Sequence, residues 1–421
     1  MTPDGTGWDA PCAISELFLY AGAVKQAGTQ HSLRLIIILG ILSAFAPFTT
    51  DTYLPGFHAM AKDFGVGIGL IELTLSLFFL GLAVGQLFYG PVIDAIGRRR
   101  PLFVGVILYI LATTVCLFTH NIHLLIAMRF LQALGGCSGM LIGRAILNDL
   151  FDALENARAQ SLLMVVMMLG PILAPILGGF LIAHFGWRSV FVFMLAFGVV
   201  CALLVALFIP ETLAAEDRQP LHLTGILRTW TTLLRKPQFT IPTLVGACAQ
   251  ACMFAFITGS SFVFINLHGV STQQYGLLFA LIALALIVGA QLNRVALRIW
   301  SPAKLLSFAQ ILNLAAGALL VAAVPTSSLI ALLVPLWLCV LSLGFSGADS
   351  VALAMSGCRE NSGSGSSLIG LLQFAGAFAV SSLIASAQNG TAWPMTISIA
   401  ACASVAVLLW FLTPSRFRTT Q

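Results

Sequence analysis

Twelve apolar runs, each long enough to cross a lipid bilayer, constrain what this chain can fold into. A membrane-spanning helix needs about 20 predominantly apolar residues. Because no water satisfies backbone N–H and C=O groups inside the bilayer, each run must satisfy them internally, as a helix does. Only 8% of the residues are charged, which excludes an ordinary soluble globular protein. The runs predict an all-α membrane protein and lie at residues 33–57, 68–92, 101–119, 122–147, 159–184, 188–209, 239–266, 275–297, 302–324, 328–354, 364–387 and 392–412.

One long hydrophilic interval, from Pro210 to Pro237, divides the runs into six and six. The two sets echo each other, because the second run ends in GPVID and the eighth in GAQLN, and each is followed by basic residues and then a proline. A parallel repeat suits two bundles that rock about a site near the membrane midplane. We predict an N-terminal tail at 1–32, a six-helix bundle at 33–209, a linker at 210–238, a second six-helix bundle at 239–412 and a C-terminal tail at 413–421.

The distribution of Lys and Arg predicts the orientation of the spans, because cytoplasmic loops carry an excess of both residues. With the N-terminus inside, sixteen basic residues fall on the inner side and only Lys62 and Arg188 fall outside. The remaining two, Arg129 and Arg144, lie within a span. We therefore predict that both ends of the chain are cytoplasmic.

Composition and motifs argue against several classes of function. The net charge of +5 is small and scattered, which argues against nucleic-acid binding. The nine cysteines lack the spacing of a metal site, so we predict no metal. The sequence contains no GxxxxGK[ST] phosphate-binding loop, which excludes ATP as the direct energy source. We find no catalytic cluster at a membrane face, and we therefore predict that the chain is not an enzyme.

A carboxyl group lies within the first apolar run, in the sequence PFTTDTYLP at positions 47–55. An Asp at the centre of a spanning helix costs about 2.5–3.5 kcal/mol on insertion scales. Pro55 adds a local break, because proline lacks an N–H and crowds the carbonyl four residues earlier, which belongs to Asp51. Such irregular backbone is tolerated where it lines a cavity or packs against protein. Either Asp51 belongs to an internal functional site, or it lies close enough to the outer surface to be solvated.

The fourth run contains a second charged group, in the sequence RFLQALG that starts at Arg129. Arg129 is about seven residues from the outer end of its run, or roughly 10 Å at 1.5 Å per residue. Asp51 lies at a similar depth, so the two side chains could meet. The alternative is an arginine that extends to the outer headgroups. Nearer the inner end, Arg144 and Asp149 are expected to form structural or gating ion pairs rather than to bind ligand.

The first inner loop has the sequence GPVIDAIGRRR, which starts at Gly90. Asp94 at the helix end can accept backbone N–H bonds or pair with an arginine such as Arg98 or Arg99. Gly90 permits close helix approach, and Gly97 permits a tight turn. An ordinary positive-inside loop explains the arginines but not the GxxxDxxG spacing. We therefore predict a cytoplasmic latch at these five residues.

The fifth run contains two prolines four residues apart, Pro171 and Pro175, between Gly170 and the pair Gly178 and Gly179. The prolines remove two helical hydrogen bonds, and the glycines admit a close neighbour. A bent and closely packed helix suits a moving element, although static packing explains the pattern equally well.

Together, these motifs resemble the major facilitator superfamily over about residues 33–412, and within it the bicyclomycin- and chloramphenicol-resistance type of proton-coupled drug exporter. The resemblance rests on TD-x-YLP around Asp51, the loop of Gly90, R-x-x-Q at Arg129 and the Gly-Pro pattern of the fifth run, which marks exporters in this superfamily. It implies that Asp51 couples protons to substrate, with Arg129 as its membrane-embedded partner. It also implies that Asp94 belongs to a cytoplasmic latch.

Other polar and aromatic residues receive weaker predictions. We take Tyr53, Gln132 and Phe254 as candidates for lining the substrate cavity. Glu72 opens the second run and is expected to be a solvated acid at a helix start. Asp349 lies near the inner end of the tenth run, where a position facing the loop is as consistent with the sequence as a functional one.

The sequence thus predicts a monomeric, multi-pass transporter in a bacterial inner membrane that exports small amphipathic compounds against inward proton flow. The expected partners are protons, a small-molecule substrate and the lipid bilayer. No cofactor is expected beyond the proton gradient. A proton-coupled importer of a nucleoside or peptide is the alternative.

Overall fold

A computed structural model describes residues 29–218, 223–358 and 362–413, and every regular element in these ranges is a helix. Most of the predicted tails at 1–32 and 413–421, and part of the predicted linker at 210–238, lie outside the described residues. The N-terminal half comprises α2 (Thr29–Ser43), α3 (Phe45–Asp51), η1 (Leu54–Gly56), α4 (Phe57–Phe64), α5 (Ile68–Ile96), α6 (Arg99–Phe118), α7 (Ile122–Leu150), α8 (Ala153–Phe185) and α9 (Arg188–Phe208). Between the halves lie η2 (Ala215–Asp217) and α10 (Leu223–Leu234). The C-terminal half comprises α11 (Pro237–Ser261), η3 (Phe262–Leu267), α12 (Thr272–Ala296), α13 (Pro302–Ala323), η4 (Val324–Thr326), α14 (Leu329–Ser356), α15 (Ser362–Ser386) and α16 (Trp393–Phe411).

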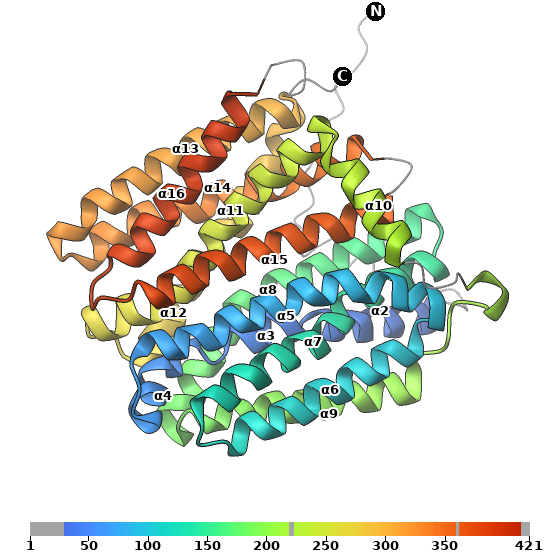
Figure 1. The fold of residues 1–421 in the computed structure, drawn as a ribbon, viewed down its shortest axis with the longest axis horizontal. Helices are drawn as coiled ribbons and strands as arrows, with labels where there is room; N and C mark the ends of the chain where they lie inside the picture. Colours follow the sequence, from blue (N-terminus) through green and yellow to red (C-terminus); the bar gives the residue numbers. More distant parts are fainter. Residues whose placement is uncertain (1–28, 219–222, 359–361, 414–421) are drawn as a thin grey trace, which may run out of the picture.

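Twelve helical segments of the described chain are long and apolar enough to cross a membrane. Each coincides with one of the twelve apolar runs, and most boundaries agree within about three residues. Figure 1 shows the two halves as separate groups of helices, the first in blue to green and the second in yellow to red. The two groups meet where α5 packs against α15 and where α8 packs against α12. The chain is therefore an all-α membrane protein of two six-helix bundles.

The first span differs most from its predicted boundaries, because it is interrupted and continues to Phe64. Its helix α3 ends at Asp51, and the single turn η1 precedes α4. The break has the cause expected from the sequence, since Pro55 has no N–H to continue the helical hydrogen bonds. The η1 turn takes its place, with the N–H of Gly56 donating to the carbonyl of Tyr53 at 2.9 Å. Asp51 is thus the last residue of a helix inside the bundle.

The turns of the bundle divide between two ends. We call the end that carries Arg98, between α5 and α6, the basic end, and the end that carries the turn at Gly65, between α4 and α5, the opposite end. The described residues form three hydrogen bonds between the halves, and all three lie at the opposite end. They join Ser261 Oγ to the carbonyl of Leu54 at 2.7 Å, Asn266 to His58 at 2.7 Å, and Gln388 to Glu72 at 3.0 Å.

Candidate functional site

Arg129 is completely buried on α7, and its charge meets neutral partners. Its guanidinium donates to Gln132 Oε1 at 2.6 Å and to the backbone carbonyl of Thr49 at 3.2 Å. The same group lies over the rings of Tyr53 and Phe78, with 4.2 and 4.4 Å from Cζ to the ring centroids. An arginine that extends to the headgroups is excluded by this burial. The guanidinium instead sits between the interrupted first span and α5.

Gln132 holds Arg129 in this position from one helical turn further along α7. Its amide Nε2 donates to the hydroxyl of Thr113 on α6 at 2.7 Å, and its Oε1 accepts from Arg129. A hydroxyl bond between Tyr109 and Thr49 at 2.9 Å ties α6 to the first span beside the same group. Because each side chain is fixed by another, the guanidinium has a defined place within the bundle.

Asp51 is also buried, with 2% of its surface exposed, so it is not solvated at the outer surface. Its Oδ1 accepts a hydrogen bond from the neighbouring hydroxyl of Thr50 at 2.8 Å. Among the described residues it forms no ion pair, so the direct contact with Arg129 that equal depth permitted is absent. Arg129 bonds instead to the backbone carbonyl of Thr49, two residues before Asp51.

The Gly-Pro segment of α8 packs tightly against the segment that carries Asp51. A Cβ added at Gly178 would lie 1.8 Å from the carbonyl oxygen of Thr52, and one at Gly170 would lie 2.7 Å from Pro47. On the other side, a Cβ at Gly179 would lie 2.4 Å from the carbonyl of Thr272, which belongs to α12 in the other half. Pro171 and Pro175 lie inside the same helix. This part of α8 therefore contacts both the Asp51 segment and the C-terminal half.

The three cavity candidates occupy two places. Tyr53 and Gln132 belong to the Arg129 cluster, and the hydroxyl of Tyr53 also meets that of Thr74 at 3.2 Å. Phe254 lies on α11 in the other half, with its ring 4.3 Å from that of Phe79 on α5. Since Phe78 faces Arg129 and Phe79 faces Phe254, adjacent residues of α5 connect the two places.

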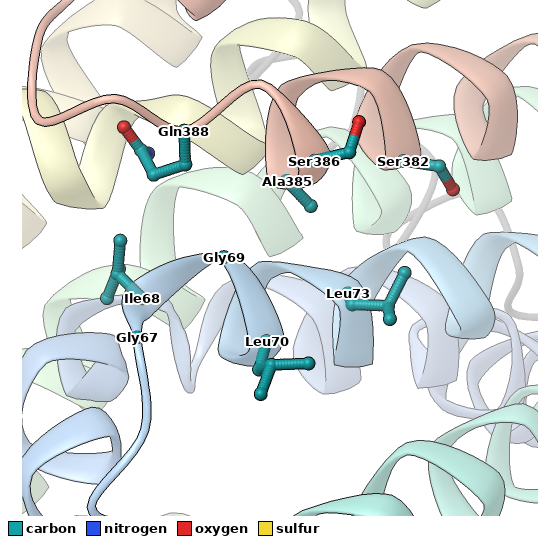
Figure 2. A pocket seen from close by; sticks show the side chains of 9 residues that line it. All are labelled: Gly67, Ile68, Gly69, Leu70, Leu73, Ser382, Ala385, Ser386 and Gln388. Atoms are coloured by element: carbon teal, nitrogen blue, oxygen red, sulfur yellow. The ribbon is translucent and has the colours of Figure 1, made fainter.

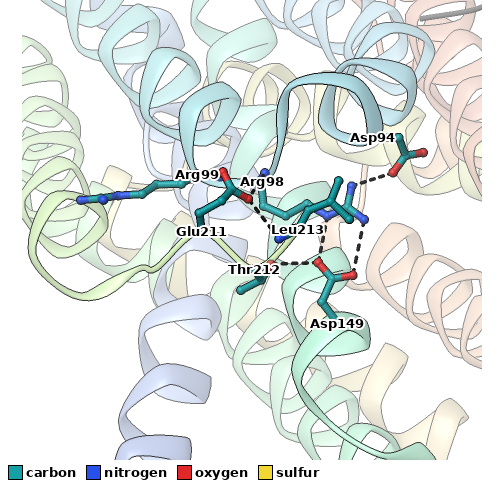
Figure 3. Close-up of polar contacts among 7 residues, drawn as sticks. All are labelled: Asp94, Arg98, Arg99, Asp149, Glu211, Thr212 and Leu213. Carbon is teal, nitrogen blue, oxygen red and sulfur yellow. Dashed lines mark hydrogen bonds and ion pairs between the residues drawn. The ribbon is translucent and has the colours of Figure 1, made fainter. Parts of the chain in front are cut away.

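Arg98 is the centre of a second charged cluster, at the basic end (Figure 3). Its guanidinium donates to Asp94 at 2.6 Å and to Asp149 at 2.9 Å. Asp149 lies at the end of α7 and also accepts from the hydroxyl of Thr212 at 2.8 Å. The expected ion pairing of Asp149 is thus present, whereas Arg144 forms no ion pair among the described residues.

The backbone N–H groups at the start of α6 are bound by Glu211 rather than by Asp94. The Glu211 carboxylate accepts from the N–H of Arg98 at 2.7 Å and from that of Arg99 at 3.3 Å. Partial burial alone would raise the pKa of Glu211, but the N–H groups of Arg98, Leu213 and Arg99 and the charge of Arg218 hold that pKa below its usual value. Glu211 follows α9, so it ties the end of the N-terminal half to the Arg98 turn.

Two glycines of this loop behave differently from each other. Gly97 adopts φ of +104°, which only glycine adopts readily, and a Cβ there would meet the Glu211 carboxylate at 2.5 Å. Gly90, by contrast, has no neighbour within 4 Å of an added Cβ. The predicted close helix approach at Gly90 is therefore wrong. Arg99 donates to the carbonyl of Ala206 at 2.7 Å, which holds it against α9.

Comparison with known proteins identifies the family. The sequence pattern of the Major Facilitator Superfamily matches residues 39–381. The chain belongs to this superfamily. A bicyclomycin resistance protein homolog from Haemophilus influenzae is 32% identical over 395 residues, which cover 92% of this chain and 98% of that protein. Multidrug resistance protein MdtL from Escherichia fergusonii is 31% identical over 391 residues, which cover 91% of this chain and 96% of that protein.

A solved structure of another transporter agrees in fold. The crystal structure of a bacterial homolog to the human lysosomal transporter Spinster, in an inward-facing and occupied conformation, superposes with a TM-score of 0.69. The match covers 94% of this chain and 100% of that chain, at 16% sequence identity. The family match, the two relatives and the twelve apolar helices of the described chain together make this protein a multi-pass membrane transporter of the major facilitator superfamily, and not an enzyme.

The structure overturns the expectation for one acid of this facilitator, Glu72, and decides between the two alternatives for another, Asp349. The prediction that Glu72 is solvated is wrong, because its side chain is completely buried at the seam between α5 and α15. The amide of Gln388 in the other half donates to it at 3.0 Å. Asp349 is buried at 1% exposure on α14 and accepts from the amide of Asn293 on α12 at 3.1 Å, so it does not face the loop.

Sequence reasoning missed several polar groups around the buried site of this facilitator. The most important are the carbonyl and hydroxyl of Thr49, the hydroxyl of Thr50 and the hydroxyl of Ser261. Thr49 and Thr50 stand in the motif itself, so their proximity to Asp51 was readable. Ser261 comes from α11, 207 positions away from its partner Leu54, and no local pattern announces that contact.

Proposed function

We propose that this facilitator exports small amphipathic compounds across a bacterial inner membrane in exchange for protons. The observation that carries the proposal is the Asp51 carboxyl, buried in the interrupted first span with a neutral hydroxyl as its hydrogen-bond partner. In the interior a carboxylate without a cationic partner is costly, whereas the protonated acid is not. Surroundings of Asp51 without a cation therefore favour proton uptake by the carboxyl, and surroundings with a cation favour proton release.

In the proposed mechanism, Arg129 supplies the positive charge that stabilises the ionised form of Asp51. Its positive charge lies within the bundle and is met by neutral oxygen acceptors and ring faces. Movement of the segment from Thr49 to Asp51 toward the guanidinium stabilises the carboxylate, and movement away stabilises the acid. Since α8 packs directly on this segment and also on α12, rocking of the halves shifts the balance at Asp51.

The surroundings of the buried site suit apolar and aromatic compounds. Phe48 contacts Phe193 and Phe197 with ring centroids 6.0 and 5.7 Å apart, and Phe79 contacts Phe254 across the halves. Flat aromatic surfaces bind large apolar ligands with few directional demands. The two relatives, a bicyclomycin resistance protein homolog and a multidrug resistance protein, support drug-like substrates.

The proton gradient is the proposed energy source, with no cofactor. One proton that moves down about 100 mV supplies roughly 2.3 kcal/mol, enough for about a 50-fold gradient of a neutral compound. We propose the halves at 33–209 and 239–412 as the two rocking bodies of a monomer, with both chain ends cytoplasmic. The basic end then faces the cytoplasm, and the hydrogen bonds at the opposite end close the outer side.

The decisive test is proton release when a transported drug is added to the detergent-solubilised protein. Wild type should release protons, and Asp51→Asn should not, because the amide imitates the protonated acid while leaving drug binding in place. Asp349→Asn is the matched control, since it removes another buried carboxyl, which accepts its hydrogen bond from the amide of Asn293. Equal release from wild type and Asp51→Asn would overturn the assignment of Asp51.

Direction of transport needs a separate measurement. Inside-out vesicles with an acidic interior should accumulate the drug, because protons leave as the drug enters. Drug that leaves such vesicles with the protons would establish the importer instead. Growth of an efflux-deficient host that expresses the chain, across a drug panel, identifies which compound to use.

A further inference from the structure

The seam between α5 and α15 at the opposite end is held by close backbone contact. A Cβ added at Gly69 would lie 2.4 Å from the carbonyl oxygen of Ala385, so only glycine permits this approach. Figure 2 shows Gly69 on α5 facing Ala385 and Gln388 across the seam. Glu72 lies one helical turn after Gly69, and its side chain is therefore carried to the C-terminal half.

The side chains of Glu72 and Gln388 form one hydrogen bond, where a carboxylic acid and an amide can form two. The amide Nε2 of Gln388 donates to Oε1 of Glu72 at 3.0 Å. The second carboxyl oxygen of Glu72, Oε2, and the amide oxygen of Gln388, Oε1, are both buried without a hydrogen-bond partner. Two acceptor oxygens cannot bond to each other, and a buried acceptor without a partner is destabilising because it has lost its hydrogen bond to water.

One proton satisfies both oxygens. A carboxylic acid and a primary amide can pair through two hydrogen bonds, N–H to C=O and O–H to C=O. The first of these is present, and a proton on Oε2 supplies the donor for the second. We propose that Glu72 is a second proton site of this transporter, protonated when the halves are closed at the opposite end and deprotonated when that end opens.

No cation near Glu72 provides an alternative means of neutralising it. Glu72 forms no ion pair or hydrogen bond with any ionisable side chain among the described residues. Lys62 and His123 are exposed, Asp63 pairs with Arg188, and α15 contains no ionisable side chain. Tyr53, between α3 and η1, also reaches α5, through its hydrogen bond to Thr74. The elements packed against α5 are α4, α6, α7, α11 and α15. The other ionisable groups on them and on α5 itself are His58, Lys62, Asp63, Tyr89, Asp94, Arg99, Arg100, Tyr109, Cys116, His123, Arg129, Cys137, Arg144, Asp149, Cys248 and Cys252.

A pocket beside the pair gives the proton a route. It has a volume of about 490 Å³ and lies in the same seam, with Gly69, Ser382 and Gln388 among the residues that line it. Gln388 thus faces the pocket while its amide holds Glu72. In the proposed orientation this end faces outside, so an external proton that reaches Glu72 favours closure there and prepares the basic end for the next substrate.

The inference rests on the proposed proton-coupled transport, but its first test does not require transport. Infrared spectra of wild type and Glu72→Gln, taken near neutral pH without drug, should differ by one protonated carboxyl C=O band. Asp51→Asn and Asp349→Asn identify the bands of the other two buried acids. Loss of an ionised carboxylate band in Glu72→Gln, with the protonated bands unchanged, would overturn the proposal.

The second test measures closure directly. Spin labels at Lys62→Cys and Asn389→Cys, in a cysteine-free background, report the distance across the opposite end from two exposed positions. In an Asp51→Asn background, which removes the contribution of the first proton site, the ratio of open to closed protein above the midpoint should rise about tenfold per pH unit, because only the proton of Glu72 is then linked to closure. Glu72→Gln should lose this dependence and stay closed, since two amides can form both hydrogen bonds.

Gln388→Leu keeps the acid at Glu72 but removes its partner, so it should be open at a pH where wild type is closed. Persistence of the wild-type pH dependence in Glu72→Gln would overturn the proposal. The Asp51→Asn variant should retain that dependence. If Asp51 does not control drug-induced proton release, the proposed function fails. The protonation of Glu72 is still tested in that case, by its infrared C=O band and by the distance between the spin labels at positions 62 and 389.

Discussion

Arg129 and Arg98 are both largely buried arginines of the N-terminal half, yet their charges are balanced in different ways. Arg98 at the basic end meets two carboxylates, Asp94 and Asp149. Arg129 within the bundle meets a carbonyl, an amide oxygen and two ring faces. A guanidinium paired with carboxylates holds elements together, whereas one among neutral groups keeps its charge available to a carboxyl whose protonation changes. We therefore call Arg98 with Asp94 and Asp149 the clamp of the basic end, and Arg129 the proposed coupling group.

The largest expected effect is at Arg129. Arg129→Met should reduce gradient-driven transport about 100-fold, because hydrogen bonds from a charged group contribute about 1.5–3 kcal/mol each. Arg129→Lys keeps the charge but loses the planar fork, and we expect a loss of about tenfold. The same exchange at Arg98 should cost less, since an ammonium still attracts both carboxylates. Equal losses for Arg129→Lys and Arg98→Lys in drug uptake by vesicles would remove the distinction.

The next effect tests whether backbone packing supports the buried site. Gly178→Ala should reduce transport by at least about tenfold, because its Cβ would lie 1.8 Å from the carbonyl of Thr52 and must displace the Asp51 segment. Gly90→Ala is the matched control at the basic end, where an added Cβ meets nothing within 4 Å. Drug uptake and the amount of folded protein are measured for both. A Gly178→Ala variant with wild-type uptake would contradict the assigned role of this contact.

A smaller effect ranks the two carboxylates of the clamp. Asp149→Asn should weaken transport several-fold, because Asp149 is less exposed than Asp94, at 19% against 57%, and also binds Thr212. Asp94→Asn should have the weaker effect on turnover, since exposed ion pairs contribute about 0–1 kcal/mol. Turnover and drug affinity are measured separately for each variant. A larger effect at Asp94 would indicate a partner for it in another conformation, as its predicted latch role requires.

The smallest effect is a pH dependence at the basic end. The pKa of Glu211 is held below its usual value by backbone N–H groups, so its stabilising contribution is present above the unfolded-state pKa of about 4.3. That contribution is lost as pH falls through the lower folded-state pKa. The unfolding temperature of wild type should therefore fall more than that of Glu211→Gln between about pH 6 and about pH 3. Glu216→Gln, another exposed acid in the same segment, should behave as wild type.

The charged sites were only partly readable from the sequence. Asp51 and Arg129 were identified because a charge within an apolar run is costly and needs an explanation. Their partners were not, because Arg129 bonds to a backbone carbonyl 80 positions away and Ser261 to one 207 positions away. Glu72 was misplaced for a related reason. A position near a helix start normally meets water, but here the C-terminal half covers it.

The sequence by itself determined the twelve spans, the interruption at Asp51 and the family. Apolar length and the missing N–H of Pro55 are local properties, which act the same way wherever the segment is placed. Only the tertiary structure decided that Arg129 bonds to the backbone of Thr49 and not to Asp51, that Glu211 binds the N–H groups expected for Asp94, and that Glu72 meets Gln388. These contacts depend on how helices distant in the chain pack. Packing in the membrane is directed by small residues such as Gly69 and Gly178, whose effect appears only when the neighbouring helix is in place.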